Sequence, residues 1–204
     1  MTAEITATQG GDTDSIVLDR LFREARTHNA WRQEPISDAL LSEIFDLAKM
    51  GPTSANCSPL RVMFLKTDEA KARLLPALAP NNVEKTRTAP VVAIMAYDLE
   101  FYEKLPKLFP HVDARAWFVG KPEMIQETAF RNSSLAAGYF ILAARAKGLD
   151  CGPMSGFDAA KVNAEFFPDG KWRANFLCNL GHGDPFALYP RNPRLDFDEA
   201  CQVL

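Results

Sequence analysis

The most informative stretch of the chain is Gly51-Pro52-Thr53-Ser54-Ala55-Asn56-Cys57-Ser58-Pro59, which separates a helical pattern from an apolar run, Val62 to Leu65, that predicts a strand. The two prolines prevent this stretch from continuing the helix or from donating hydrogen bonds to a sheet. The hydroxyl and amide side chains between them bond nearby backbone groups and favour a tight, irregular loop. By composition alone, the stretch is an ordinary helix-to-strand turn.

The order of residues in this loop resembles the Pro-Ser-Ser-x-Asn-x-Gln-Pro loop of the FMN-dependent nitroreductase family. Gly51 in front and Cys57-Ser58 in place of the usual pair are similar to one branch, the malonic semialdehyde reductases (3-hydroxypropanoate dehydrogenases) of pyrimidine degradation. Four segments carry the likeness in the same order over residues 15–204. The resemblance implies that Pro52, Thr53, Ser54 and Asn56 face the ribityl chain and ring of FMN.

Length and composition bound the class of protein. The 204 residues are 47% hydrophobic and 24% charged, which indicates a single globular domain, here residues 15–204, after a polar, flexible N-terminal tail of residues 1–14. A net charge of -3 argues against a nucleic-acid partner. The longest apolar run, Ala89 to Tyr97, has half the length of a membrane span, and the tail does not resemble a signal peptide. We therefore expect a cytoplasmic protein without a membrane partner.

The cysteines and histidines suggest neither a metal site nor a disulfide framework. Cys57, Cys151, Cys178 and Cys201 form no Cys-x-x-Cys pair, and His28, His111 and His182 are scattered. Zinc sites have regular ligand spacings, which are missing here. We expect free thiols in a reducing compartment and no bound metal.

Apolar periodicity predicts a sheet layered between helices, an α/β (α+β) fold with a mixed sheet. The predicted helices are Ser15–Thr27, a helix that starts after the N-cap Ser37 and stops at Gly51, Asp68–Leu78, Pro122–Lys147 with Gly148 as its stop, and Phe157–Phe166. The predicted strands are Arg61–Thr67, the central Ala89–Tyr97, and Asn175–Leu180. A loop is predicted through Asn81-Asn82, and a short helix with a mobile flap over 99–117.

The resemblance implies the three-layer fold of the family and a homodimer in which the long helix lies at the interface. Small residues between Ser133 and Gly138 permit close approach of another helix, but tight packing inside one subunit fits the same pattern.

A phosphate site is implied at the end of the first helix. Arg26-Thr27-His28-Asn29 resembles the family's Arg-Ser-x-Arg, with Asn29 in place of the second cation. An arginine fork suits a phosphate dianion, and Arg194 and Arg191 in the tail resemble the basic patch that completes the site. Each arginine alone is more typical of a solvated surface charge, but the resemblance favours a phosphate role for Arg26 and Arg194, and Arg194 aligns better than Arg191.

The ring of the flavin is implied to lie near two further segments. Asn82 and Lys85 keep the family's spacing of an amide before a lysine, whose charge would favour reduced FMN, although Glu84 and Lys85 also fit an exposed surface pair. Pro153-Met154-Ser155-Gly156 resembles the segment over the opposite ring face, where Gly156 permits close backbone approach. Asp158 is interpreted as a helix N-cap and His182 as a structural residue.

The implied activity is reduction of malonic semialdehyde, a small aldehyde, to 3-hydroxypropanoate by NADPH (or NADH), in ping-pong hydride transfer through flavin N5. The substrate carboxylate needs a cation, for which Arg131 is one candidate and His111 and Arg115 are others. The sequence contains no Gly-x-Gly-x-x-Gly fingerprint, which fits a nucleotide bound transiently over the flavin. The alternatives are a broad nitro or quinone reductase and a flavin-binding protein without turnover.

Overall fold

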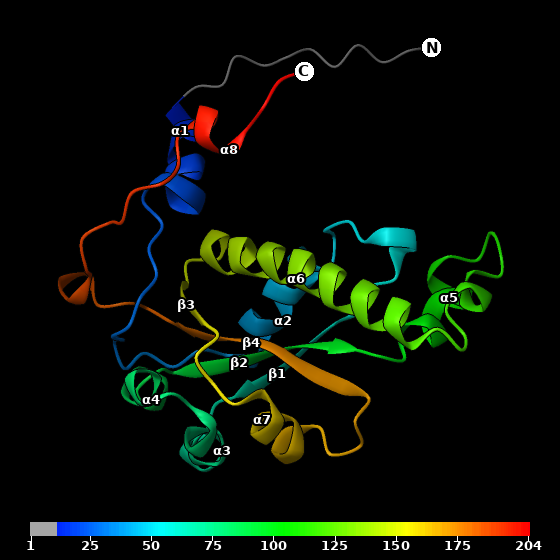
Figure 1. Cartoon of the computed structure of the whole chain (residues 1–204). Helices are drawn as coiled ribbons and strands as arrows, with labels where there is room; N and C mark the ends of the chain where they lie inside the picture. Colours follow the sequence, from blue (N-terminus) through cyan, green and yellow to red (C-terminus); the bar gives the residue numbers. More distant parts are fainter. Residues whose placement is uncertain (1–11) are drawn as a thin grey trace.

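The computed structural model describes residues 12–204, so most of the expected tail, residues 1–14, lies outside the described residues. Four strands form one sheet: β1 (Leu60–Leu65), β2 (Val91–Asp98), β3 (Asp150–Met154) and β4 (Trp172–Gly181). The α-helices are α1 (Asp12–Leu18), α2 (Asp38–Ala48), α3 (Asp68–Leu74), α4 (Pro80–Arg87), α5 (Leu105–Leu108), α6 (Pro122–Ala146), α7 (Ala159–Phe166) and α8 (Phe197–Ala200). Figure 1 shows their arrangement.

The sheet has the strand order β1-β2-β4-β3, and every pair of neighbouring strands is antiparallel. The expectation of a mixed sheet is therefore corrected. Parallel pairing among the described residues is limited to the isolated bridge between Thr27 and Cys151. The chain reverses direction between β1 and β2 through α3 and α4, and again between β3 and β4 through α7, which makes each of these neighbours antiparallel.

Helices cover both faces of the sheet (Figure 1). Helices α2 and α6 lie over one face, and α3, α4 and α7 lie over the other. Alternate residues of β2 enter two separate cores: Val91, Ala93 and Met95 join the first, while Val92, Ile94 and Ala96 join the second. All eight residues of β2 are buried, which confirms the prediction of a central strand.

Helix α2 begins as predicted, because the hydroxyl of Ser37 accepts a hydrogen bond from the backbone N–H of Leu40 at 3.2 Å. It ends at Ala48, three residues before Gly51, which does not adopt a left-handed conformation. The role of Gly51 as a helix stop is thus wrong. A Cβ there would lie 2.7 Å from the ring of Tyr139 on α6, so the position needs glycine because an aromatic ring occupies the space.

Two elements were not predicted. The segment read as a loop through Asn81-Asn82 is helix α4, which starts with Pro80 in its first turn, a position where proline is favoured. Residues 150–154 form the edge strand β3 in spite of Gly152 and Pro153. Proline is tolerated at a sheet edge, where its missing N–H does not interrupt a ladder on both sides.

The other predictions need smaller corrections. The first helix ends at Arg23, in a π-helical turn, instead of Thr27. Helix α6 confirms the predicted long helix, and Gly148 follows it with φ +88°. Residues 99–117 contain short helical turns around α5. Within residues 12–204, no helix is both long and apolar enough to cross a membrane.

Candidate functional site

The loop of residues 52–58 is held in a strained conformation. Ala55, Asn56 and Ser58 have φ values of 48°, 51° and 41°, in a region that non-glycine residues rarely adopt. Such strain costs on the order of 1–3 kcal/mol at each residue and is found mainly at functional sites. The loop is thus a strong candidate for binding on physical grounds alone.

Hydrogen bonds from three sides maintain this shape. The backbone N–H of Ser54 donates to Oδ1 of the buried Asn132 on α6 at 2.8 Å. The N–H of Ser58 donates to the hydroxyl of Thr53 at 3.1 Å, and the side-chain amide of Asn56 donates to the carbonyl of Leu108 at 2.8 Å. Pro52 and Ser54 are exposed. The amide of Asn56, expected to face a flavin, thus connects the loop to the end of α5.

A second group of predicted residues gathers around β3. Thr27 and His28 lie beside this strand: the His28 N–H donates to the carbonyl of Cys151 at 3.0 Å. The His28 ring is buried, with Nε2 3.4 Å from a carboxylate oxygen of Asp150. His28 therefore points into the protein, whereas Thr27 is exposed and Asn29 is half-buried.

Asn82 on α4 and Gly156 after β3 are in direct contact. The buried Asn82 side chain donates from Nδ2 to the carbonyl of Gly156 at 2.8 Å. A Cβ on Gly156 would lie 2.5 Å from the same nitrogen, so a larger residue would force the two segments apart. Pro153 is half-buried, Met154 is buried and Ser155 is exposed beside this contact.

Lys85 lies one helical turn after Asn82 and is half-buried. Its backbone carbonyl accepts hydrogen bonds from Nε1 of Trp31 at 3.0 Å and from Nδ2 of Asn179 at 3.1 Å, which fixes this turn of α4 against the sheet. Burial lowers the pKa of the Lys85 ammonium group. No carboxylate in the part of the chain that the structure describes pairs with it.

Arginines connect the first helical segment to the C-terminal segment. Arg26 donates to the carbonyl of Tyr189 at 2.5 Å, and Arg191 donates to the carbonyls of Arg23 at 2.7 Å and Ala25 at 3.1 Å. Arg194 instead folds back onto the carbonyls of residues 192 and 193. The structure thus brings Arg191 close to Arg26, although the resemblance favoured Arg194.

The loop 52–58 and the start of β3, where Thr27 and His28 lie, are at diagonally opposite corners of the sheet. Leu60, next to the loop, aligns through Tyr97 with Arg173 at one end of β4, whereas Asp150 aligns with Gly181 at the other end. Eight residues of strand span about 27 Å, and β1 and β3 are opposite edges of the sheet. A single chain therefore keeps the loop apart from Thr27 and the start of β3, whereas Met154, at the other end of β3, aligns with Leu177, closer to the loop's end of β4.

The cations proposed for a substrate carboxylate are engaged elsewhere. Arg131 is exposed and pairs with Glu127 one turn earlier on α6. Arg115 donates to both carboxylate oxygens of Glu103 at 2.7 and 2.8 Å. His111 is exposed and packs edge-on against Phe109.

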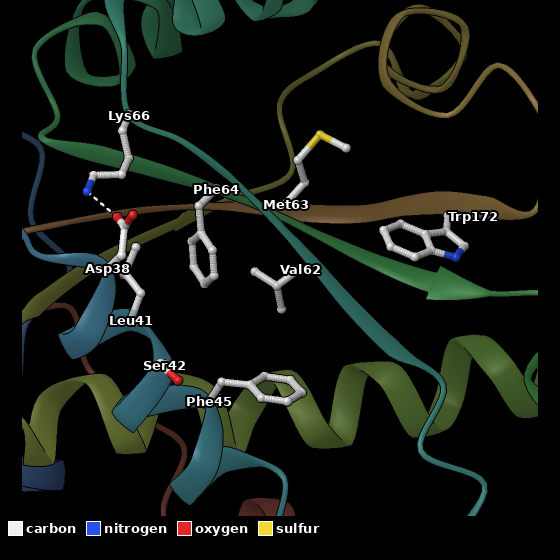
Figure 2. Close-up of a pocket in the computed structure, with 9 residues that line it drawn as sticks. All are labelled: Asp38, Leu41, Ser42, Phe45, Val62, Met63, Phe64, Lys66 and Trp172. Carbon is white, nitrogen blue, oxygen red and sulfur yellow. Dashed lines mark hydrogen bonds and ion pairs between the residues drawn. The ribbon is translucent and has the colours of Figure 1, made fainter. Parts of the chain in front are cut away.

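Two hollows lie beside α2. One, of about 530 Å³, is lined by the loop, by the ends of α2 and β1 and by the α5 segment. The other, of about 600 Å³, follows the edge strand β1 and contains none of the predicted site residues. Figure 2 shows Val62 and Phe64 directed toward Leu41 and Phe45 of α2, with a Lys66–Asp38 ion pair at one end. The first hollow is the candidate ligand pocket because the strained loop forms one of its walls.

All four cysteines are free, and Cys57, Cys151 and Cys178 are buried. Burial raises the pKa of the Cys57 thiol to about 11, so this loop residue is a poor nucleophile near neutral pH. Among residues 12–204, no cluster of His, Cys, Asp and Glu side chains could hold a metal ion.

Asp158 caps α7 as predicted, because its side chain accepts hydrogen bonds from the backbone N–H groups of Ala160 and Lys161. His182 pairs with Glu34 at 3.7 Å.

Several residues that support the candidate site were not predicted. Asn132 holds the loop, Tyr139 packs on Gly51, and Trp31 and Asn179 position α4. Asn132 directly follows Arg131, which was selected for its charge. The sequence offered only a weak signal, an asparagine beside the small residues Ser133 and Ser134, because its burial and its need for a partner appear only in the structure.

Known proteins share this architecture. The family model described as "Nitroreductase family" matches residues 22–182. A protein of Polynucleobacter asymbioticus named "Putative NADH dehydrogenase/NAD(P)H nitroreductase" is 62% identical over 187 residues, which cover 92% of this chain and 95% of that protein.

Solved structures agree in fold. A "putative nitroreductase in complex with FMN" from Exiguobacterium sibiricum has a TM-score of 0.82 at 19% identity, covering 97% of this chain and 99% of that chain. A gut-bacterial enone reductase of fatty acid saturation has a TM-score of 0.79 at 18% identity, covering 92% and 97%. The match over most of the chain and the close relative establish that this protein is a member of the nitroreductase family.

Proposed function

We propose that the protein is an FMN-dependent, NAD(P)H-oxidising reductase whose acceptor is malonic semialdehyde, which it converts to 3-hydroxypropanoate. The observation that carries the proposal is the rigid, strained loop of residues 52–58, whose sequence resembles the reductases of that substrate. FMN, when bound, supplies a carrier that accepts hydride from the nucleotide and passes it to the acceptor. The names of the relatives support the nucleotide and the flavin.

The residues around β3 fit a flavin. Lys85 offers a half-buried ammonium that no carboxylate among the described residues neutralises, which suits the negative charge of a reduced ring. Asn82 keeps its Oδ1 as an acceptor, because Nδ2 is bonded to Gly156. Arg26 and Arg191 meet where the phosphate is expected, with Thr27 exposed beside them. In this proposal they bind the phosphate, while His28 supports Thr27 from inside.

We further propose that the active unit is a homodimer. The loop 52–58 and the phosphate residues at the start of β3, Arg26 and Thr27, lie too far apart in one chain to contact the same flavin. A second copy related by a two-fold axis brings the loop of one chain to the β3 group of the other. The exposed side chains of Phe130, Leu135 and Tyr139 on α6, each between 42% and 48% accessible, are suited to such an interface.

A mixing experiment tests the shared site. Arg26→Glu repels the phosphate, and Ser54→Trp blocks the exposed side of the loop, so each variant alone is expected to be inactive. Dimers formed at random from both chains would contain one intact site in half of all dimers, restoring about a quarter of wild-type activity. Absence of any recovery, with mixed dimers demonstrated, would place the site within one chain and contradict the dimer proposal.

Anaerobic kinetics test the function itself. The purified protein should be yellow and should bleach rapidly with NADPH or NADH, and it should then reoxidise with malonic semialdehyde. A flavin-binding protein without turnover would not bleach rapidly. A higher kcat/KM for nitroaromatics or quinones than for malonic semialdehyde would instead favour the second candidate, a broad nitro or quinone reductase, to which the names of the relatives point.

A further inference from the structure

The charged side chains that line the hollow of about 530 Å³ beside the loop are all basic. The charged side chains that line it are Lys49, Arg61, Lys104 and Lys107, and none of its lining residues is acidic. Its remaining surface is apolar or carries hydroxyl and amide groups from the loop. A concave site of this size and sign is suited to an organic anion with an apolar body.

Two of the four cations are already neutralised. The Arg61 guanidinium donates to a carboxylate oxygen of Asp98 at 2.5 Å and to the carbonyls of Ser58 and Leu60, which holds the end of the loop. Lys49 pairs with Asp46 at 2.5 Å. These two side chains therefore shape the pocket and carry little free positive charge.

Lys104 and Lys107 have no such partner among the residues that the structure describes. The carboxylates closest in sequence form ion pairs with other residues, Glu103 with Arg115 and Glu100 with Lys171. The hydrogen bond from Arg115 lowers the pKa of Glu103 most, and Lys104 lowers it to a lesser extent. Three residues apart on consecutive helical turns, the two ammonium groups lie on the same side and repel each other. An anion bound between them would relieve this repulsion.

The backbone of the α5 segment, which carries the two lysines, is held to the loop. The Asn56 side chain bonds to the carbonyl of Leu108, directly after Lys107, and Asn56 lies in the strained part of the loop. The α5 segment and the loop thus form adjacent walls of the pocket. A ligand whose reactive end lies along the loop can place an anionic group at α5.

We propose that Lys104 and Lys107 form an anion subsite that receives the carboxylate of the acceptor or the 2′-phosphate of NADPH. This inference rests on the proposed function in one respect, that reduction takes place along the loop 52–58. It moves recognition of the anion from Arg131, Arg115 and His111, which the sequence suggested, to two lysines that form no ion pair within residues 12–204.

Calorimetric titration of the flavin-loaded protein tests the subsite independently of turnover. Benzoate and benzamide have the same shape and differ in charge, as do 2′,5′-ADP and 5′-AMP at the 2′ position. The double variant Lys104→Gln/Lys107→Gln should bind one of the two anionic probes about tenfold more weakly, with no change for its matched partner. Lys121→Gln, the loss of an exposed lysine outside the pocket, should change neither.

Each outcome has one meaning. Weaker benzoate binding assigns the subsite to an acceptor carboxylate, and weaker 2′,5′-ADP binding assigns it to the nucleotide. Unchanged binding of both anions, or no binding of either by the wild type, overturns the proposal. If the lysines control anion binding but the wild-type protein reduces no acceptor, the proposed function fails and the anion subsite stands. Where turnover occurs, KM for 4-nitrobenzoate against 4-nitrobenzamide provides a second, kinetic comparison.

Discussion

Asn82 and Gly156 come from different elements and meet at a single hydrogen bond, 2.8 Å from the side-chain nitrogen of Asn82 to the carbonyl oxygen of Gly156. The absence of a Cβ on Gly156 makes this contact possible. Helix α4 and the end of β3 are thereby held together where the proposed site places the flavin ring.

Gly156→Ala should displace Asn82, because the new Cβ would lie 2.5 Å from its Nδ2. We expect FMN affinity to fall about tenfold, the equivalent of one lost hydrogen bond. Fluorescence titration of the apoprotein with FMN measures this. In a double-mutant cycle, Gly156→Ala should add little to Asn82→Ala, and full additivity of the two changes would show that the contact is unimportant.

Asn132→Ala should loosen the loop. The variant leaves the Ser54 N–H without its acceptor and should cost about 1–3 kcal/mol in free energy of unfolding. Urea unfolding measures the loss. Asn132→Asp is not a suitable control, because it retains the acceptor oxygen but loses the donation from Nδ2 to the carbonyl of Thr128 and buries a charge. A loss well below about 1 kcal/mol in Asn132→Ala would mean that the Ser54 hydrogen bond contributes little to the stability of the loop.

The Lys85 ammonium should destabilise the flavin-free protein and stabilise the complex. Burial lowers its pKa below the ordinary 10.5, so the unfolded chain binds this proton more tightly than the folded chain does. The free energy of unfolding of the apoprotein should therefore rise with pH as the ammonium group loses its proton. Lys85→Met should therefore raise the Tm of the apoprotein by about 2 °C and weaken FMN binding. Thermal unfolding with and without FMN measures both. An unchanged FMN affinity would remove Lys85 from the site.

Alkaline pH should destabilise the protein through Cys57. Burial raises its pKa from 9.0 to about 11, so the folded chain keeps a proton that the unfolded chain loses. The free energy of unfolding should therefore fall as pH rises from about 9 to about 11, with no contribution from this thiol below about 8. Cys178 acts in the same direction, because a hydrogen bond with Cys151 and complete burial raise its pKa as well.

Cys57→Ala should make this alkaline loss less steep, as measured by urea unfolding at about pH 8 and about pH 10. Cys201→Ala is the control, since Cys201 is exposed. A thiol reagent at neutral pH should modify Cys201 in the native protein and reach the other three cysteines after unfolding. The same pH slope in wild type and Cys57→Ala would contradict the role of this thiol.

The sequence predicted what local rules determine. The cap at Ser37, the buried β2 and the long α6 follow from side-chain chemistry and periodicity, and the structure confirms them. Strand β3 was missed because Gly152 and Pro153 disfavour a strand, and its edge position becomes evident only once β4 is placed beside it.

Contacts between residues distant in sequence also limited how much of the candidate site could be predicted. The loop, Asn82 and Gly156 were each available from a resemblance, but the contact between Asn82 and Gly156 was not, and the partner that holds the loop is distant in sequence, with Asn132 lying 78 residues from Ser54. The separation of the loop from the β3 group depends on strand register, which no local pattern determines. The sequence could not identify Lys104 and Lys107, because their lack of an ion pair among the described residues depends on the pairing of Glu103 with Arg115 and of Glu100 with Lys171 in the folded chain.

The two distant corners of the sheet have a consequence for how this protein behaves in a cell. If each flavin contacts both chains, coenzyme occupancy and subunit association are linked equilibria, and each strengthens the other by the same factor. Shortage of riboflavin would then weaken assembly, and dilution would release the coenzyme as the subunits separate. The protein concentration at which half of the coenzyme is released would then follow the dissociation constant of the dimer.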